Sequence, residues 1–188
     1  MSTGYQIKDQ EALYFLTFQI VDWIDIFTRK IYKDILIDSF KYSSEHKGFQ
    51  LFAYVIMSNH VHLIANSTEG KLSDSIRDIK KFTSRNIVET MKDIPESRRK
   101  WMLNRFAFNA SQLKSVKNYQ VWTHENHAIE IYSDKFINRI INYIHNNPVK
   151  AGIVEKPEDY LYSSARNYSG LSAPIDIQLL TLRWHTYK

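Results

Sequence analysis

The sequence predicts an α+β fold: a ferredoxin-like (split βαβ) core with an antiparallel sheet and additional helices. The first observation is the order of the segments. Segments with strand character alternate with segments of helical periodicity as strand–helix–strand–strand–helix–strand. The second is the length of 188 residues, which suits a single domain over 1–188. The third is the 44% of hydrophobic residues, enough to build a core and to exclude global disorder.

The N-terminal half supplies one strand, one helix and a hairpin. The expected segments are a strand at 13–20, a helix at 24–42, a polar break at 43–48, and strands at 49–57 and 60–66. The first strand is rich in aromatic and β-branched residues. The helix is predicted from apolar residues at roughly helical spacing, namely Ile24, Phe27, Ile31, Ile35 and Phe40. Ser58 and Asn59 suit the tight turn of the hairpin.

The C-terminal half alternates longer helices with short elements. The expected segments are a helix at 71–91, a short basic helix after Pro95, short strands at 119–123 and 127–132, helices at 133–147 and 158–168, and a loosely packed tail at 170–188. The apolar stripe of the first helix is Leu72, Ile76, Ile79, Phe82 and Ile87. Ser133 is a suitable N-cap. Pro148 is expected to end the helix that Ser133 begins, because the residue before a proline disfavours helical geometry.

Composition excludes several kinds of site. The chain has no cysteine, so disulfides, thiolate metal sites and cysteine nucleophiles are excluded. No apolar run reaches the roughly 18 residues of a membrane helix, and the first residues lack the apolar stretch of a signal peptide, so we expect no membrane partner and a cytoplasmic location. A formal charge of +5 permits a polyanionic partner. Twelve Tyr, ten Phe and four Trp could include platforms for unpaired bases, although most are expected in the core.

His60 and His62 are the first candidates for chemistry. They lie two residues apart in a predicted strand, so both side chains lie on one face while Val61 points to the other. Two neighbouring imidazoles on a rigid strand form half of a site for a divalent metal. The alternative is an incidental pair at a hairpin edge, and the two-residue spacing alone favours this alternative.

Tyr143 and Asn147 are the second pair. They lie four residues apart on a predicted helix and therefore share a face. A tyrosine hydroxyl acts as a nucleophile when a metal or a base activates it, and an amide oxygen four residues further on could reach the same metal. The alternative is an ordinary interfacial Tyr143 and a helix-capping Asn147, which this pair in isolation favours.

The two pairs lie within two longer motifs. Residues 53–64, AYVIMSNHVHLI, resemble the HUH motif region of the single-tyrosine transposases. Residues 143–168, YIHNNPVKAGIVEKPEDYLYSSARNY, are similar to the tyrosine helix of that family and its following loop. The chain thus resembles the insertion-sequence-200-like transposases, and more closely their REP-associated tyrosine transposase branch. The resemblance covers about residues 11–169, with Ser58 at a position where such motifs more often have proline.

The resemblance implies a role for each of the four residues. Tyr143 would be the catalytic tyrosine on a C-terminal tyrosine helix, His60 and His62 the metal ligands, and Asn147 the polar third ligand. The implied activity is metal-dependent nicking of single-stranded DNA near a hairpin, with strand transfer through a 5′-phosphotyrosine intermediate. Imidazole and amide ligands alone suit zinc better, whereas the resemblance implies Mg²⁺ or Mn²⁺. Relatives include monomers and homodimers that exchange the tyrosine helix, so both arrangements stay open.

Basic and acidic side chains elsewhere are further candidates. Candidates for phosphate contacts are Lys80, Lys81, Arg85, Arg98, Arg99, Lys100 and Arg105, with a solvated helix face as the equally favoured alternative. His124 and His127 lie in a predicted turn, and we expect His127 to be structural or to contact DNA. His145 follows Tyr143 by two residues and should point elsewhere. The spacing of Glu125 and Glu130 gives no argument for acid or base catalysis.

Two other functions compete with strand transfer. One is a domesticated protein that binds DNA hairpins without transposition, and the other is an unrelated metal-dependent hydrolase. The hydrolase would not need Tyr143, and the sequence lacks a second carboxylate-rich metal site. A metal-dependent covalent adduct with single-stranded DNA distinguishes the three functions.

Overall fold

The computed structural model describes residues 6–113 and 117–180. Within these residues the strands form one antiparallel sheet of order β2-β3-β1-β4. The strands are β1 (Tyr14–Gln19), β2 (Phe49–Ile56), β3 (His60–Ser67) and β4 (Ile129–Glu130). This order, with β3 between β1 and β2, is the predicted ferredoxin-like arrangement, and it places β3 in the interior of the sheet.

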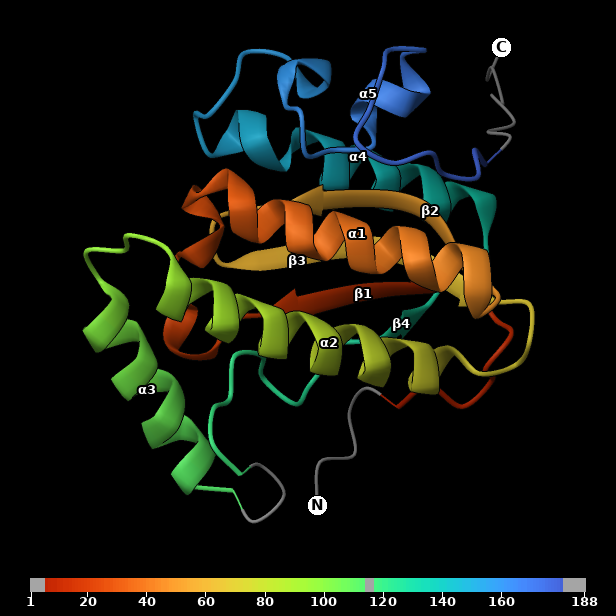
Figure 1. Cartoon of the computed structure of the whole chain (residues 1–188). Coiled ribbons are helices and arrows are strands. Elements are labelled where there is room, and N and C mark those ends of the chain that lie inside the picture. The colour runs from red at the N-terminus through yellow and green to blue at the C-terminus, as the bar shows by residue number, and fades with distance from the viewer. Residues whose placement is uncertain (1–5, 114–116, 181–188) are drawn as a thin grey trace, which may run out of the picture.

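Helices cover both faces of the sheet. Figure 1 shows α1 (Lys30–His46) and α2 (Leu72–Asp93) lying across one face, with α4 (Asp134–Lys150) behind the sheet. Phe18, Tyr54 and Leu63 are fully buried residues of the sheet, and Phe40 of α1 packs against Tyr54. α4 contacts β2 and β3. The side chains between β3 and α4 therefore determine which chemistry is possible on the face of the sheet that α4 covers.

The helix predicted at 24–42 begins later than expected. Two short 3₁₀ turns, η1 (Val21–Trp23) and η2 (Ile26–Thr28), precede α1. Asp22 and Trp23 have left-handed backbone angles, with φ of 54° and 55°, which no right-handed helix accommodates. Ile24 and Phe27 are buried in this turn, whereas Ile31 lies on an exposed face of α1. The buried face of α1 instead contains Tyr32, Leu36, Ile37 and Phe40.

The predicted helix at 71–91 is confirmed as α2, but Phe82 lies outside its buried stripe. Phe82 is exposed, and Thr83 is buried in its place. The indole of Trp122 donates a hydrogen bond to the Thr83 hydroxyl over 2.9 Å. The strand predicted at 119–123 is reduced to a single bridge between Trp122 and Ile20, and the strand at 127–132 to β4. The basic stretch after Pro95 continues as α3 (Arg99–Ser111), as expected.

Pro148 does not end the tyrosine helix. α4 runs from Asp134 to Lys150 with Pro148 inside it, so the predicted end at residue 147 is wrong. A proline near a helix end removes only the hydrogen bond to the carbonyl four residues earlier, here Ile144, and Pro148 gains burial in exchange. The predicted N-cap is confirmed, because the Ser133 hydroxyl accepts a hydrogen bond from the Phe136 amide.

The segment after α4 seals the free edge of β2. The predicted helix at 158–168 is instead η3 (Pro157–Asp159) and α5 (Ala165–Tyr168), with an extended piece between them. The carbonyl of Tyr162 accepts from the Ile56 amide, and the Ser164 amide donates to the carbonyl of Tyr54. Extended chain at this edge satisfies backbone groups that a helix would leave open.

Part of the predicted loose tail is packed. Ile175 is buried, and the Gln178 amide donates to the carbonyl of Leu51. Residues 181–188 of the expected tail lie outside the described residues. None of the helices in the described part of the chain combines the length and the hydropathy that crossing a membrane requires.

Candidate active site

β3 places His60 and His62 side by side on the face that α4 covers. Their ring centroids are 4.7 Å apart at an interplanar angle of 67°. The alternation of side chains along a strand produces this proximity. His62 is buried and lies opposite Thr17 of β1, whereas His60 lies at the more open end of β3. Both imidazoles are thus directed to one location, as the spacing predicted.

α4 brings Tyr143 to this location. The Tyr143 hydroxyl lies 3.2 Å from Nε2 of His62, and the two rings are 5.1 Å apart. Phe15 of β1 stacks on His62 at 5.4 Å and meets the edge of Tyr143 at 6.0 Å. Tyr143 remains 40% exposed, so its hydroxyl is both positioned from within and open to a large substrate. All these residues belong to one chain.

Oxygen atoms hold the Nδ1 side of both imidazoles. Asn59 donates through Nδ2 to the carbonyl of Trp23, which fixes its Oδ1 as the atom 2.8 Å from Nδ1 of His60. An amide oxygen only accepts, so Nδ1 of His60 carries the proton and Nε2 carries the lone pair. The Thr17 hydroxyl lies 2.9 Å from Nδ1 of His62. Such outer contacts orient the histidines of metal sites.

Burial favours the neutral form of both histidines. Burial lowers the pKa of His60, and burial together with the neighbouring His60 lowers the pKa of His62 to about 3. A neutral imidazole is the form that ligates a metal. The pair therefore offers nitrogen lone pairs at physiological pH and does not first have to lose protons.

Asn147 lies one helical turn after Tyr143 on α4 and is the third member of the predicted donor set. Its Nδ2 donates to the carbonyl of Tyr143 over 3.1 Å, a bond that does not consume the ligating oxygen Oδ1. Among the described residues no group of three or more His, Cys, Asp or Glu side chains could hold a metal. The candidate set therefore consists of two imidazoles and an amide oxygen, few enough ligands to leave coordination positions for substrate.

His145 points away from this site, as expected. Its Nε2 lies 2.9 Å from the hydroxyl of Ser164, which is fully buried behind α4. Burial lowers the pKa of His145 to about 4. His145 therefore contributes to packing between α4 and the segment that covers β2.

Lys80 occupies an internal position. Its ammonium donates to the carbonyls of Thr123 and Glu125 and to the side chain of Asn126. Burial lowers the pKa of Lys80 to about 7, while these three acceptors favour its charged form. Lys80 thus holds the turn at 123–126 against α2, while it also lines the groove described below.

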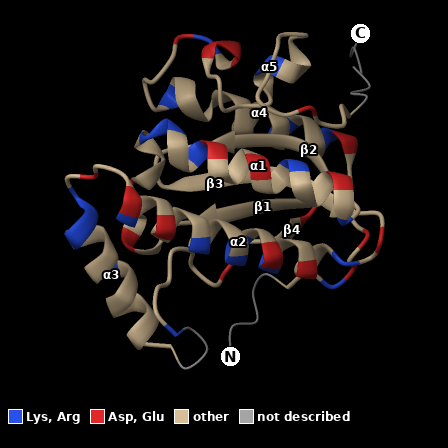
Figure 2. Ribbon diagram, viewed as in Figure 1, with Lys and Arg blue, Asp and Glu red and all other residues tan. Residues whose placement is uncertain are grey.

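Several of the other predicted phosphate-binding residues have partners within the chain. Arg98 pairs with Asp25, Arg105 with Asp22, and Arg85 with Glu89, while Arg99 donates to the carbonyls of Met91 and Ile94. Lys81 and Lys100 are exposed. Figure 2 shows basic residues along α2 interspersed with acidic ones. Arg99 therefore joins the start of α3 to the end of α2, whereas Arg98 joins it to the segment before η2. Lys81 and Lys100 are the better placed for phosphate.

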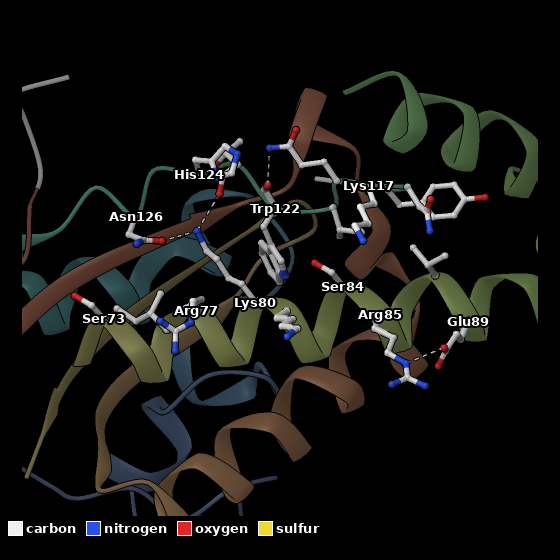
Figure 3. A pocket seen from close by; sticks show the side chains of 18 of the residues that line it. Ser73, Arg77, Lys80, Ser84, Arg85, Glu89, Lys117, Trp122, His124 and Asn126 are labelled. Carbon is white, nitrogen blue, oxygen red and sulfur yellow. Dashed lines mark hydrogen bonds and ion pairs between the residues drawn. The ribbon is translucent and has the colours of Figure 1, made fainter. Parts of the chain in front are cut away.

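A groove lies between α2 and the segment at 117–126. It has a volume of about 710 Å³. Figure 3 shows Lys80 extending from α2 to the opposite segment, whereas Arg85 points towards Glu89. The basic lining residues are Arg77, Lys80, Lys81, Arg85, Lys92 and Lys117, together with His124. His127 lies outside this lining, with its Nε2 3.9 Å from the Glu125 carboxylate, and Glu130 accepts from the Tyr14 hydroxyl. The groove is a second basic surface, separate from the tyrosine site.

Four residues of the site were missed in the sequence. Thr17 and Phe15 alternate on β1, two residues apart, so their position opposite β3 could have been inferred once the strand register was known. Asn59 directly precedes the first histidine, but its bond to His60 depends on the turn. The contact of Trp23 with His60 arises from the left-handed turn and has no periodic pattern in the sequence.

Comparison with known proteins identifies the family. A family model described as Transposase IS200 like matches residues 16–147. A Haemophilus influenzae protein named as a REP-associated tyrosine transposase is 28% identical over 153 residues, which cover 81% of this chain and 79% of that protein. The solved structure of a REP-associated tyrosine transposase bound to a REP hairpin aligns over 100% of both chains, with 19% identity and a TM-score of 0.63. A Deinococcus radiodurans protein assigned as a transposase has 18% identity, a TM-score of 0.42, and coverage of 78% of this chain and 95% of its own.

The structural likeness at a TM-score of 0.63 supports the α+β fold. The family match extends over most of the chain and includes β3, with its two histidines, and Tyr143 and Asn147 of α4. The chain therefore belongs to the IS200-like transposase family.

Proposed function

We propose that this transposase-family chain nicks single-stranded DNA with Tyr143 and transfers the strand through a 5′-phosphotyrosine intermediate. One observation carries the proposal: the hydroxyl of a partly exposed tyrosine lies 3.2 Å from a buried histidine that has a second histidine beside it. Structural tyrosines at helix surfaces do not require such an arrangement. A nucleophile for a phosphodiester does, because its oxygen must be held where a bound metal ion would favour loss of the proton.

The proposed reaction balances without a further reactant. The Tyr143 oxygen attacks the phosphorus, a new P–O bond forms, and the bond from phosphorus to the 3′ oxygen of the preceding nucleotide breaks. The hydroxyl proton leaves Tyr143, and the departing 3′ oxygen ends as a hydroxyl. Attack by the 3′-hydroxyl of a second strand reverses these bonds and releases Tyr143, so no nucleotide hydrolysis is needed.

Residues of the site hold and orient the reacting groups. His60, His62 and Asn147 would hold Mg²⁺ or Mn²⁺, which would polarise the scissile phosphate as a Lewis acid. Thr17 and Asn59 keep the Nε2 atoms of the histidines directed to the site. Phe15 packs on both His62 and Tyr143, so it limits the rotation of each ring.

We further propose that the substrate carries a DNA hairpin. A structurally similar protein was solved with a REP hairpin, and this chain has a basic groove apart from the tyrosine site. The stem would be held through its phosphates by exposed lysines such as Lys81, while an unpaired flank enters the space beside Tyr143. One copy contains both Tyr143 and His62, so nicking does not require a dimer.

The experiment is a covalent-adduct assay. The full chain is mixed with a labelled oligonucleotide library that carries hairpins with unpaired flanks, in Mg²⁺ or Mn²⁺, and is separated under denaturing conditions. We expect an adduct that chelation abolishes and that Tyr143→Phe reduces by roughly a thousand-fold or more, because the nucleophilic oxygen is gone. Tyr132→Phe is the matched control, since Tyr132 is an 85% exposed tyrosine that precedes α4.

Other outcomes identify the competing functions. Hairpin binding without any adduct would indicate a domesticated DNA-binding protein. Metal-dependent cleavage that persists in Tyr143→Phe would indicate a hydrolase and would contradict the assigned nucleophile.

A further inference from the structure

A tryptophan with an exposed indole lies beside the candidate metal ligands. Trp23 is 59% exposed, and its ring centroid lies 6.2 Å from that of His60 at 77°. The contacts His60–His62 and His62–Tyr143 continue from there at 4.7 and 5.1 Å. The four rings form a continuous row in which Trp23 is one terminal member and the proposed nucleophile is the other.

The backbone beneath this indole is strained and is held by specific contacts. Asp22 and Trp23 are consecutive residues in the left-handed region, a costly conformation for a bulky side chain. The Asp22 carboxylate accepts hydrogen bonds of 2.9 Å from Arg105 and 2.7 Å from Asn109, both on α3. Asn59 donates to the carbonyl of Trp23 over 3.2 Å. Core packing does not account for this arrangement, because more than half of the indole faces solvent.

We propose that Trp23 is a stacking platform for an unpaired nucleobase of the strand that Tyr143 attacks. This inference rests on the proposed function and adds a base-binding position to it. Asp22 neutralises Arg105, so the turn offers an aromatic surface where a phosphate site would offer charge. Asn59 donates to the Trp23 carbonyl and accepts from His60, so it fixes the platform relative to the proposed ligand.

The first test measures binding without cleavage. The full chain is titrated, in buffer without divalent metal, into fluorescein-labelled (dT)₁₂ and into an abasic oligomer of the same length and charge. We expect Trp23→Ala to weaken binding of (dT)₁₂ about tenfold, the effect of losing one stacked base, and to leave binding of the abasic oligomer unchanged. Trp23→Phe should retain part of the preference, because a smaller aromatic face remains.

Trp101→Ala is the matched control, since Trp101 is a 50% exposed tryptophan on α3. We expect it to bind both oligomers like the unaltered chain. The salt dependence of Trp23→Ala should also be unchanged, because no phosphate contact is lost. Equal weakening for both oligomers, or no weakening for either, would overturn the inference. Thermal unfolding of each variant shows whether it still folds. If Trp23→Ala does not fold, the binding preference of Trp23→Phe tests the inference instead.

The second test identifies which nucleotide near the cut stacks on Trp23. In an oligonucleotide that forms the Tyr143 adduct, single abasic replacements near the cut should slow adduct formation at one position, and Trp23→Ala should remove this sensitivity. An adduct with no Trp23-dependent position would overturn the inference and leave the proposed function intact. A Trp23-dependent preference for (dT)₁₂ without any adduct would support the platform and contradict the proposed function.

Discussion

Two histidine–hydroxyl pairs lie on either side of the same helix and have opposite consequences. At one, His62 meets the hydroxyl of Tyr143 at 3.2 Å, and the tyrosine is partly exposed. At the other, His145 meets the hydroxyl of Ser164 at 2.9 Å, and the serine is fully buried. Burial lowers the pKa of both histidines, to about 3 for His62 and about 4 for His145. Local chemistry and pKa are therefore nearly the same in the two pairs.

The surroundings distinguish them. His62 has a second imidazole beside it and an exposed nucleophile in front of it. The partner of His145 is locked into the backbone of β2, because Ser164 accepts from the amide of Tyr54. A depressed pKa is thus a poor guide to function when it arises from burial alone, and access for a substrate is the better one.

The largest expected difference between the pairs is in metal-dependent activity. His62→Gln should reduce adduct formation by roughly a hundred-fold or more, because a ligating imidazole and the partner of Tyr143 are lost together. His145→Gln should leave it within about threefold at pH 7.5. Initial rates over a Mn²⁺ titration measure both variants. Equal losses in the two would show that the pairs do not differ as proposed.

Both buried histidines should make the stability of the protein depend on pH, and the contribution of His145 can be separated by substitution. His145 has a folded-state pKa of about 4, below the value near 6.5 of an unfolded histidine. Its stabilising contribution is therefore complete above pH 6.5 and is lost as the pH falls towards 4, by on the order of 3 kcal/mol in all. Urea unfolding at several pH values should show a shallower loss in His145→Gln. An unchanged slope would contradict the role of His145.

Removing the hydroxyl of Thr17, which contacts His62, or that of Ser164, which contacts His145, compares the two pairs more closely. Thr17→Val removes the oxygen beside Nδ1 of His62, and we expect about a tenfold rise in the Mn²⁺ concentration needed for adduct formation, with stability little changed. Ser164→Ala should lower the free energy of unfolding by about 1–3 kcal/mol, because the buried Tyr54 amide and the His145 ring lose their hydrogen-bond partner. The Mn²⁺ requirement should be unchanged. The reverse result would mean that Thr17 is only structural.

The smallest expected effect concerns the basic groove. Lys81→Ala should weaken hairpin binding and reduce the slope of log K against log salt by about one, the loss of one phosphate contact. Arg98→Ala is the control, because Arg98 pairs with Asp25 within the chain. Gel-shift titrations at several salt concentrations measure both slopes. A larger slope change for Arg98→Ala would place the hairpin over α3 instead.

Local patterns in the sequence were sufficient for the order of the main strands and helices and for the faces that the candidate residues share, whereas the roles of these residues came from the family resemblance. Strand and helix periodicities gave the segment order of the sheet, and alternation along a strand placed His60 and His62 on one face. The four-residue spacing gave Tyr143 and Asn147 a common face of α4. These features depend on backbone geometry that repeats every two or every 3.6 residues, so neighbours in sequence suffice to predict them.

Tertiary structure decided the contacts between distant segments. The approach of Tyr143 to His62 joins residues 81 positions apart, and nothing in either motif fixes their distance. Lys80 was predicted to contact phosphate, and in the structure its ammonium is hydrogen-bonded to the turn at 123–126. Pro148 was predicted to end the helix, but it is buried within α4, and this burial offsets its lost hydrogen bond. The turn that presents Trp23 is held by side chains of α3 and of the hairpin. Burial and hydrogen-bond satisfaction depend on what packs around a residue, so they are determined only when the whole chain has folded.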